Sequence, residues 1–288
     1  MISASTIKHL RIPFSLFLMP IFVFALANAE PNALYNTIIT FIVLHIFIYP
    51  ASNGYNSYFD KDEGSIGGLK HPPKVTKDLY TAALIFDGIG ILLALTINIW
   101  FALMIFIYGL ISKAYSHPKI RLKKYPIISW LTVGLFQGAF TYFMSISALT
   151  DSGFEIWLEH AVYIPAIVST LLVMGSYPMT QIYQHEEDTK RGDRTISVIC
   201  GIRGTFYLTA FMFLIGMTSF YYYLSTYQTM QHFYIMLAAL SPVFIYFNYW
   251  FFKVLNNENE ASFEHTMRFN LISAIFFIGY FAWYAFKV

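Results

Sequence analysis

Carboxylate and amide side chains gather in the segment YPASNGYNSYFDKDEGSIGG, residues 49–68, at the end of a long apolar run. Asn53, Asn56 and Asp60 follow one another at spacings of three and four residues. These spacings place side chains on one face of a helix, and Glu63 would continue this face if the helix persisted. Polar groups are costly where a helix leaves a membrane, so the pattern indicates a binding role.

A second segment, TQIYQHEEDTKRGDRT at residues 180–195, repeats this chemistry with Gln181, Gln184 and Asp188 at helical spacing. Carboxylate and amide oxygens are hard ligands that suit Mg2+, which is usually completed by water and substrate phosphates. One such cluster at a helix end is more often simply solvated. The presence of two favours a Mg2+ site that binds a diphosphate.

The basic loop KAYSHPKIRLKK, residues 113–124, could supply cations to such a ligand. The tendency of cytoplasmic loops to be positively charged would by itself account for most of these Lys and Arg residues. One or two of them remain candidates for contact with phosphate oxygens, and Tyr115 and Ser116 offer hydroxyls beside them.

Apolar helices must position these segments. The chain has 288 residues, of which 57% are hydrophobic, 19% aromatic and 12% charged, and its mean hydropathy is +0.54. This profile is typical of a polytopic membrane protein, in which each crossing takes roughly 20 apolar residues. We predict an all-α fold with nine transmembrane helices around a central cavity open to the cytoplasm, at about 13–30, 35–57, 79–97, 99–115, 127–149, 157–183, 204–225, 231–252 and 267–286.

Several classes of function are disfavoured by composition. The single cysteine, Cys200, excludes a disulfide framework and a multi-cysteine metal site, and the formal charge of +2 gives no support for nucleic acid as a partner. The His residues lack the spacings typical of zinc sites.

The distribution of Lys and Arg predicts the orientation. With nine crossings, all of them except Lys287 fall at the N-terminus or in the loops after the second, fourth, sixth and eighth helices. Since cytoplasmic loops hold the positive excess, we expect the N-terminus and the loops with Asp60, Arg121 and Asp188 to be cytoplasmic, in an integral protein of the bacterial inner membrane.

The N-terminus has an alternative interpretation. Lys8 and Arg11, the apolar run 12–24 and the small residues of ALANAE imitate a cleaved secretory signal. Removal of this segment would leave the orientation of the other helices unchanged.

The recurrence of the polar clusters suggests internal repetition. Four helices separate the first cluster from the second, and a basic loop lies between them. We predict a single transmembrane domain over 1–288, made of two four-helix halves at about 1–125 and 126–264 and a ninth helix.

Three segments together resemble the UbiA superfamily of intramembrane prenyltransferases, over essentially the whole chain. NSYFDKDEG, residues 56–64, is similar to the first family motif, NDxxDxxxD. QHEEDTKRGDRTISVICG, residues 184–201, is similar to the second, DxxxD followed by K..G.RT, and YSHPKIRLKKYP, residues 115–126, resembles the family's basic loop.

The resemblance implies a Mg2+-dependent enzyme that transfers an isoprenoid chain from its allylic diphosphate to an aromatic or lipid acceptor in the bilayer, with nine transmembrane helices. Mg2+ with Lys or Arg would neutralise the leaving diphosphate while the C–O bond ionises to an allylic cation. Aromatic side chains would stabilise that cation. The acceptor and the length of the isoprenoid are open.

Residues carried over from the motifs form three sets. The family implies catalytic roles for Asn56, Asp60 and Asp188, a metal site of Asp60, Asp62, Glu63, Gln184 and Asp188, and a diphosphate site of Asn53, Tyr115, Lys119, Arg121 and Lys190. Ser57 and Gly64 stand where the first motif has Asp, and Gln184 where the second has Asp. Fewer charged ligands should weaken metal binding.

Asp87, in the middle of the third predicted helix, and Gln181 are candidates for the substrate cavity. An acid within the membrane indicates function by default, but Asp87 would equally well pair with a neighbouring helix. Two other classes of function remain open: a transporter, because a pseudo-repeated bundle with polar residues at one mouth describes many carriers, and a non-catalytic family member that binds an isoprenoid.

Overall fold

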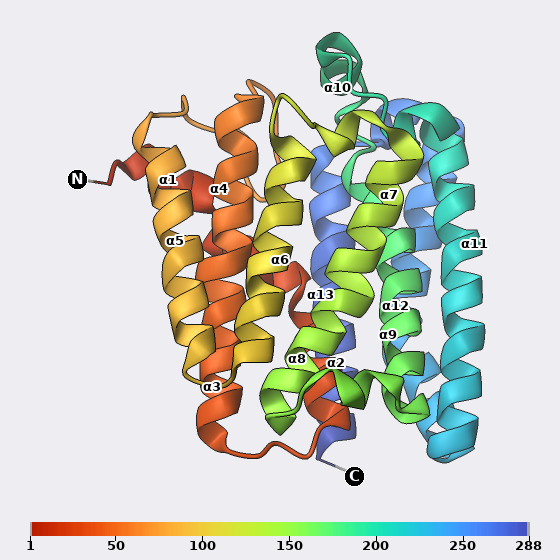
Figure 1. Ribbon diagram of the computed structural model, residues 1–288. Coiled ribbons are helices and arrows are strands. Elements are labelled where there is room, and N and C mark those ends of the chain that lie inside the picture. Colours follow the sequence, from red (N-terminus) through yellow and green to blue (C-terminus); the bar gives the residue numbers. More distant parts are fainter. Residues whose placement is uncertain (1, 287–288) are drawn as a thin grey trace. The chain divides into compact units, whose positions relative to one another are not determined.

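The computed structural model describes residues 2–286, and most of this part of the chain is helical (Figure 1). The β pairing among these residues is limited to one isolated bridge between Ile66 and Leu69. The predicted all-α class is therefore confirmed.

Eight helical segments of the described chain are long and apolar enough to cross a membrane. A ninth crossing results if the segments Ala4–Phe17 and Met19–Asn28, bent by 45° at their junction, count as one span. The eight are Leu34–Asp60, Asp78–Leu95, Ile99–Ser116, Pro126–Thr150, His160–Thr180, Ile196–Tyr227, Met230–Asn256 and Phe263–Ala285. The predicted number of helices agrees with this finding when the bent pair is counted.

Contacts divide the chain into two compact units. Unit 1 runs from the N-terminus to Leu16 and includes Ala29–Lys123 and Met144–Phe154; unit 2 holds Phe17–Asn28, Lys124–Phe143 and the chain from Glu155 onward. Helix α2 (Met19–Asn28) thus packs in unit 2, and the last part of α8 (Thr141–Thr150) packs in unit 1. The two predicted halves remain a hypothesis about the repeat.

Unit 1 is built on a continuous span in which α3 (Leu34–Ile42), the π-helical segment Val43–Ile48 and α4 (Tyr49–Asp60) follow one another. Helices α5 (Asp78–Leu95) and α6 (Ile99–Ser116) pack beside α4 (Figure 1). Gly90 permits the close approach of α5, because a Cβ there would lie 2.6 Å from Cδ1 of Ile48. The packing brings the C-terminal ends of α4 and α6 to the same end of the unit.

The short helix α1 (Ala4–Leu10) holds the loop that follows α4. At its end Arg11 donates to the carbonyl oxygens of Gly67 at 3.1 Å and Asn53 at 3.3 Å. Nε2 of His9 lies 2.7 Å from the carbonyl oxygen of Pro73. Cleavage of the N-terminal segment as a signal peptide would therefore remove the hydrogen bonds of Arg11 and His9 to the rest of unit 1.

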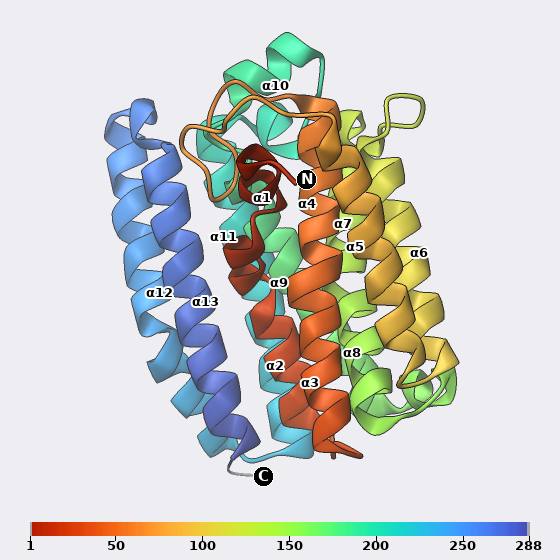
Figure 2. The same ribbon diagram turned by 90° about the vertical axis from the view of Figure 1, so that its left-hand side faces the viewer.

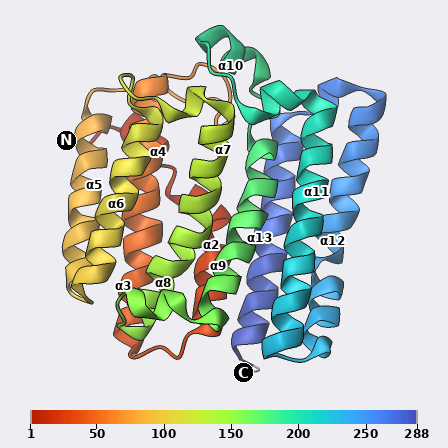
Figure 3. The same ribbon diagram turned by 45° about the vertical axis from the view of Figure 1, so that its right-hand side comes forward.

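Unit 2 contains α7 (Pro126–Gly134), the π-helical segment Leu135–Phe140 and α9 (His160–Ser176), followed by α11 (Ile196–Tyr227), α12 (Met230–Asn256) and α13 (Phe263–Ala285). Helix α9 packs against α7 and α11 (Figure 3), while α12 and α13 form an antiparallel pair (Figure 2), and α2 packs against α13. In the core Phe24 stacks on Phe281 with ring centroids 4.4 Å apart. Buried aromatic pairs of this kind contribute to the stability of the unit.

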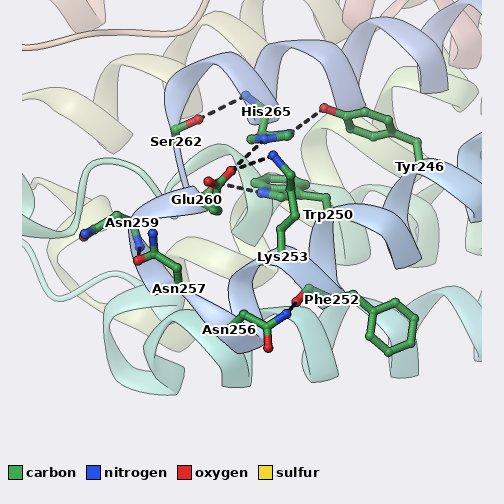
Figure 4. Close-up of polar contacts among 10 residues, drawn as sticks. All are labelled: Tyr246, Trp250, Phe252, Lys253, Asn256, Asn257, Asn259, Glu260, Ser262 and His265. Atoms are coloured by element: carbon green, nitrogen blue, oxygen red, sulfur yellow. Dashed lines mark hydrogen bonds and ion pairs between the residues drawn. The ribbon is translucent and has the colours of Figure 1, made fainter.

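A cluster of polar side chains lies at the connection between α12 and α13 (Figure 4). Oε2 of Glu260 lies 3.1 Å from both Nζ of Lys253 and Nε2 of His265. Trp250 donates to the carbonyl oxygen of Glu260 at 2.8 Å, and the Tyr246 hydroxyl lies 2.7 Å from Nδ1 of His265. The hydrogen bond from Lys253 lowers the pKa of Glu260 below its ordinary value.

Candidate active site

Helix α4 ends within the first polar segment, at Asp60, slightly beyond the predicted end of this span at 57. Lys61 adopts the left-handed conformation with φ 52° and ψ 40°, and its N–H donates to the carbonyl oxygen of Ser57 at 3.0 Å. This cap ends the helix at Asp60. Asp62 and Glu63 therefore lie in the loop, so the helix does not persist to Glu63 and Glu63 does not continue its face.

Two cations from the loop after α6 hold Asp60. Lys123 forms an ion pair with Oδ2 of Asp60, and Nη2 of Arg121 lies 3.6 Å from Oδ1. The Asp60 side chain is only 3% exposed, and that of Lys123 9%. Cations and a carboxylate thus lie together at one largely buried place, a combination that can contact both a metal ion and phosphate oxygens.

Asn56 lies one turn before Asp60 and joins α4 to the end of α6. Its Nδ2 donates to Oγ of the buried Ser116 at 2.8 Å. Asn53, a further turn back, accepts the hydrogen bond from Arg11 through its carbonyl oxygen. We name Asn56, Asp60, Ser116, Arg121 and Lys123 the first cluster.

The remaining predicted residues of unit 1 lie around the first cluster in different environments. Tyr115 is partly buried in the last turn of α6, whereas Lys119 is exposed in the loop that follows. Asp62 is half-buried and Glu63 exposed. The predicted roles of Tyr115, Lys119, Asp62 and Glu63 stay predictions.

The second polar segment is interrupted, so the predicted stripe of Gln181, Gln184 and Asp188 on one helix is wrong. Helix α9 ends at Ser176, a 3-10 turn follows over Tyr177–Thr180, and Gln184 caps a new helix, α10 (His185–Arg191). Pro178 near the start of the 3-10 turn lacks the N–H that a continuous helix needs. Gln181 is buried, and its Nε2 donates to the Tyr177 hydroxyl at 2.7 Å.

Asp188 lies in α10 and is buried. Nη2 of Arg191, three residues further on, lies 3.7 Å from its Oδ1, and Nε of Arg191 lies 3.5 Å from Oδ2 of Asp193. Helix α10 ends at Gly192, whose φ of 79° favours glycine. We name Asp188, Arg191 and Asp193 the second cluster; in it two carboxylates share one guanidinium.

Lys190 is on the exposed side of α10. It pairs with Glu186 one turn earlier, with Nζ 2.6 Å from Oε1. This contact lowers the pKa of Glu186 and raises the pKa of Lys190. The predicted contact of Lys190 with a diphosphate would have to compete with this solvent-exposed pair.

Asp87 is buried in α5 and forms an ion pair with Lys113 of α6. Nζ of Lys113 also lies 5.5 Å from the centre of the Tyr55 ring, a cation–π contact with α4. The structure favours the second of the two interpretations of Asp87, a pairing residue between helices.

Sequence reasoning missed Lys123, Arg191 and Asp193 as members of the clusters. The sequence does not distinguish Lys123 from its exposed neighbour Lys124, because both belong to the same basic loop. Asp193 is 2% exposed and follows the glycine that ends α10. The Gly192 signal for a helix end could have indicated that Asp193 turns back toward Arg191.

The ligand set suits Mg2+ only with further ligands from outside the protein. Among residues 2–286, no three His, Cys, Asp or Glu side chains lie together in a way that could hold a metal ion. Mg2+ is commonly bound by one or two carboxylates together with substrate phosphates and water. Asp60 in unit 1 and Asp188 in unit 2 each offer one buried carboxylate, which fits that mode of binding.

The helices and the polar clusters at their ends define a polytopic integral membrane protein. The sequence model of the UbiA prenyltransferase family matches residues 17–281, and the chain belongs to this family. Membership supports prenyltransferase activity in general. A comparison with curated proteins found no match.

Solved structures of UbiA homologues share the fold. The homologue from Archaeoglobus fulgidus bound to GPP and Mg2+ is 19% identical, with a TM-score of 0.70 over 98% of this chain and 99% of that chain. The same homologue bound to DMAPP and Mg2+ gives 18% identity and a TM-score of 0.71 over 99% and 100%. The apo homologue from Aeropyrum pernix K1 is 17% identical, with a TM-score of 0.72 over 94% and 98%.

Proposed function

We propose that the protein transfers an isoprenoid chain from an allylic diphosphate to an aromatic or lipid acceptor within the membrane, with Mg2+ as cofactor. Family membership supports the reaction class. The homologue that binds GPP or DMAPP with Mg2+ supports the choice of donor and metal.

The observation that carries the proposal is the surroundings of Asp60. A buried carboxylate faces Lys123 and Arg121, and the Asn56 amide lies one turn away. A site that must hold both a metal ion and a diphosphate needs oxygen ligands and cations together. The first cluster offers both.

Asp60 and Asp188 are our proposed protein ligands for Mg2+, with Asp62, Glu63 and Gln184 as weaker contributors. Bound Mg2+ would withdraw charge from the diphosphate as it leaves. Arg121 and Lys123 would bind the phosphate oxygens, together with Asn53, Tyr115, Lys119 and Lys190 in supporting roles. Both clusters then serve the same reaction, and neither is dispensable.

The protein's part in the chemistry is electrostatic. Breaking the allylic C–O bond leaves its electron pair on the diphosphate, and cations already held in a buried site stabilise that charge without reorganising. Acceptor attack on the allylic carbon then forms the new bond and releases a proton. Arg121 is suited to this role because its guanidinium remains protonated throughout.

A second candidate function is binding of an isoprenoid diphosphate without turnover. The observation that favours it is the number of neutral groups in the motifs: Ser57 is buried where the family has Asp, and Gln184 caps α10 where the family has Asp. Weak metal binding would then leave the donor intact.

One assay separates these functions. Purified protein in lipid nanodiscs is given labelled DMAPP or GPP, a membrane lipid extract as the source of acceptor, and Mg2+ or EDTA. We expect release of diphosphate and a labelled lipid with Mg2+ only. Retention of intact donor on the protein would favour the binding function, and movement of unaltered donor into sealed proteoliposomes would favour a transporter.

The location of the clusters is part of the proposal: we place the N-terminus and both clusters on the cytoplasmic side of a bacterial inner membrane. The distribution of Lys and Arg supports this orientation. Single-cysteine variants at Lys119 and Glu187, made in a Cys200→Ser background, should react only with a reagent that enters the cytoplasm. Labelling at Lys119 by an impermeant reagent on intact cells would contradict it.

A further inference from the structure

His185, the first residue of α10, joins the second motif to the interior of α11. Its Nε2 lies 2.7 Å from Oγ of Ser197, and Oγ of Ser197 lies 2.9 Å from Oγ1 of Thr205. The Thr205 hydroxyl donates to the carbonyl oxygen of Gly201 at 2.8 Å. Ser197 and Thr205 are fully buried, so these bonds form away from water.

The hydrogen atoms in this chain of bonds can be assigned from its last member. Because the Thr205 proton is committed to a carbonyl oxygen, Oγ1 of Thr205 accepts from Ser197. Oγ of Ser197 then accepts from His185, which carries its proton on Nε2. The carbonyl oxygen of Ser197, at 3.3 Å from Oγ1 of Thr205, is a second acceptor on the far side of the kink, and His185 starts the chain.

The chain of bonds spans a kink. Gly201 has φ 71° and ψ 172°, outside the helical region, and interrupts α11 between Ser197 and Thr205. Only glycine adopts this conformation readily. Side-chain bonds across the break replace the backbone bonds that a regular helix would have, so they fix the angle between the two parts of α11.

Helix α10 needs such an anchor. It has seven residues, and an isolated helix of this length is unstable in water. Its bonds from Thr189 to the His185 carbonyl oxygen, and from Lys190 to Glu186, are internal to the helix. His185 instead reaches a buried partner on another helix.

We propose that His185 is a positioning residue that fixes α10 to the kink in α11 and so sets the place of Asp188 for binding of the Mg2+–diphosphate, an inference that rests on the proposed function. It acts through Ser197 and Thr205 and touches no substrate. Binding of Mg2+ and diphosphate at Asp188 tightens the kink through the same bonds.

Cys200 reports on the kink directly. It is the only cysteine of the chain, precedes Gly201, and is partly exposed. We would measure its alkylation rate by N-ethylmaleimide in the full-length protein, with Cys200→Ser as the blank. His185→Ala and Thr205→Val should label several-fold faster than wild type, while His185→Gln, which retains a donor of similar reach, and Thr205→Ser should label near the wild-type rate.

The second part of the experiment adds Mg2+ with inorganic diphosphate. We expect this ligand to slow the alkylation of Cys200 in wild type. His185→Ala should need about tenfold more ligand to halve the alkylation rate, because it lacks one hydrogen bond that supports binding. In the transfer assay His185→Ala should raise the donor KM by a similar factor with a smaller effect on kcat. Thr189→Val, which removes a hydroxyl bond internal to α10, is the matched control and should behave as wild type.

Unchanged alkylation rates in both His185→Ala and Thr205→Val would overturn the proposal. So would failure of His185→Gln to restore the wild-type rate while Thr189→Val behaves normally. Because the rates without ligand require no turnover, they test the coupling even if the protein transfers no prenyl group. Failure of the proposed function would show separately, as absence of diphosphate release in wild type.

Discussion

The two clusters hold their central carboxylates in different ways. Asp60 faces cations from a loop that follows another helix, and its side chain is 3% exposed. Asp188 faces Arg191 of its own helix at 3.7 Å, and the guanidinium also serves Asp193. A buried charge is costly unless it is paired; the Asp60–Lys123 pair forms through tertiary structure, whereas the Asp188–Arg191 pair lies within one helix. Changes in the first cluster should therefore affect both folding and reaction more strongly.

The largest effect is expected for Asp60→Asn. The change removes a proposed metal ligand and leaves Lys123 without its buried counter-charge, so turnover should fall at least about a hundredfold while the protein still inserts into the membrane. Diphosphate release at saturating Mg2+ measures it. Glu260→Gln, which removes the carboxylate of another Lys-paired residue, is the control and should retain full activity; near-normal turnover in Asp60→Asn would refute the role of Asp60.

Double-mutant cycles should separate the two clusters next. The coupling between Asp60→Asn and Lys123→Met in the free energy of unfolding should be roughly 1–3 kcal/mol, as for buried groups in contact. Asp188→Asn and Arg191→Met should couple by roughly 0.5 kcal/mol, as expected for a pair on one helix. Unfolding in mixed micelles with increasing SDS gives these values. Equal couplings would remove the distinction between tertiary and local pairing.

Gln184→Asp addresses the weaker charge of the second motif. An amide oxygen adds no negative charge to a metal site, so the carboxylate should lower the Mg2+ concentration for half-maximal activity severalfold without changing the product. If Gln184 instead contacts the acceptor, the acceptor KM should rise while the Mg2+ requirement stays the same. Magnesium and acceptor titrations on the same preparation distinguish these outcomes.

The smallest effect concerns Glu260, a paired carboxylate outside both clusters. Its pKa is lowered in the folded protein, chiefly by Lys253, so its stabilising contribution is present above the unfolded pKa, ordinarily 4.5, and is lost as the pH falls through the lower folded value. Glu260→Gln should therefore have a slightly lower Tm than wild type at pH 7. The difference should shrink below about pH 4; a constant difference would mean that charge is not the cause.

Sequence patterns predicted the features that depend on composition and local spacing. Long apolar runs identified the crossing helices, and the motifs around Asp60 and Asp188 identified the family. The same patterns failed where a turn decides the outcome: a 3-10 turn separates Gln181 from α10, so the predicted stripe with Gln184 and Asp188 does not form on one helix. Helical spacing contains no information about where a helix stops.

Long-range pairing was the other limit. The partner of Asp60 is Lys123, far along the chain, and nothing in the basic loop distinguishes Lys123 from the exposed Lys124. The crossing predicted at 204–225 corresponds to the part of α11 after the kink at Gly201, and the helical turn before the kink, from Ile196, was not predicted. The packing of the helices decides which Lys pairs with Asp60. The spacing of residues in a single sequence does not reveal this packing.

The central claim is that both clusters act in Mg2+-dependent release of diphosphate from an allylic donor. The most direct test measures diphosphate released per labelled lipid formed by wild type, Asp60→Asn and Asp188→Asn, with and without EDTA. The account predicts one diphosphate per labelled lipid for wild type with Mg2+. It predicts neither diphosphate nor labelled lipid from the two variants, or from wild type with EDTA. Intact donor bound by folded wild type in the presence of Mg2+, with no diphosphate released, would contradict it.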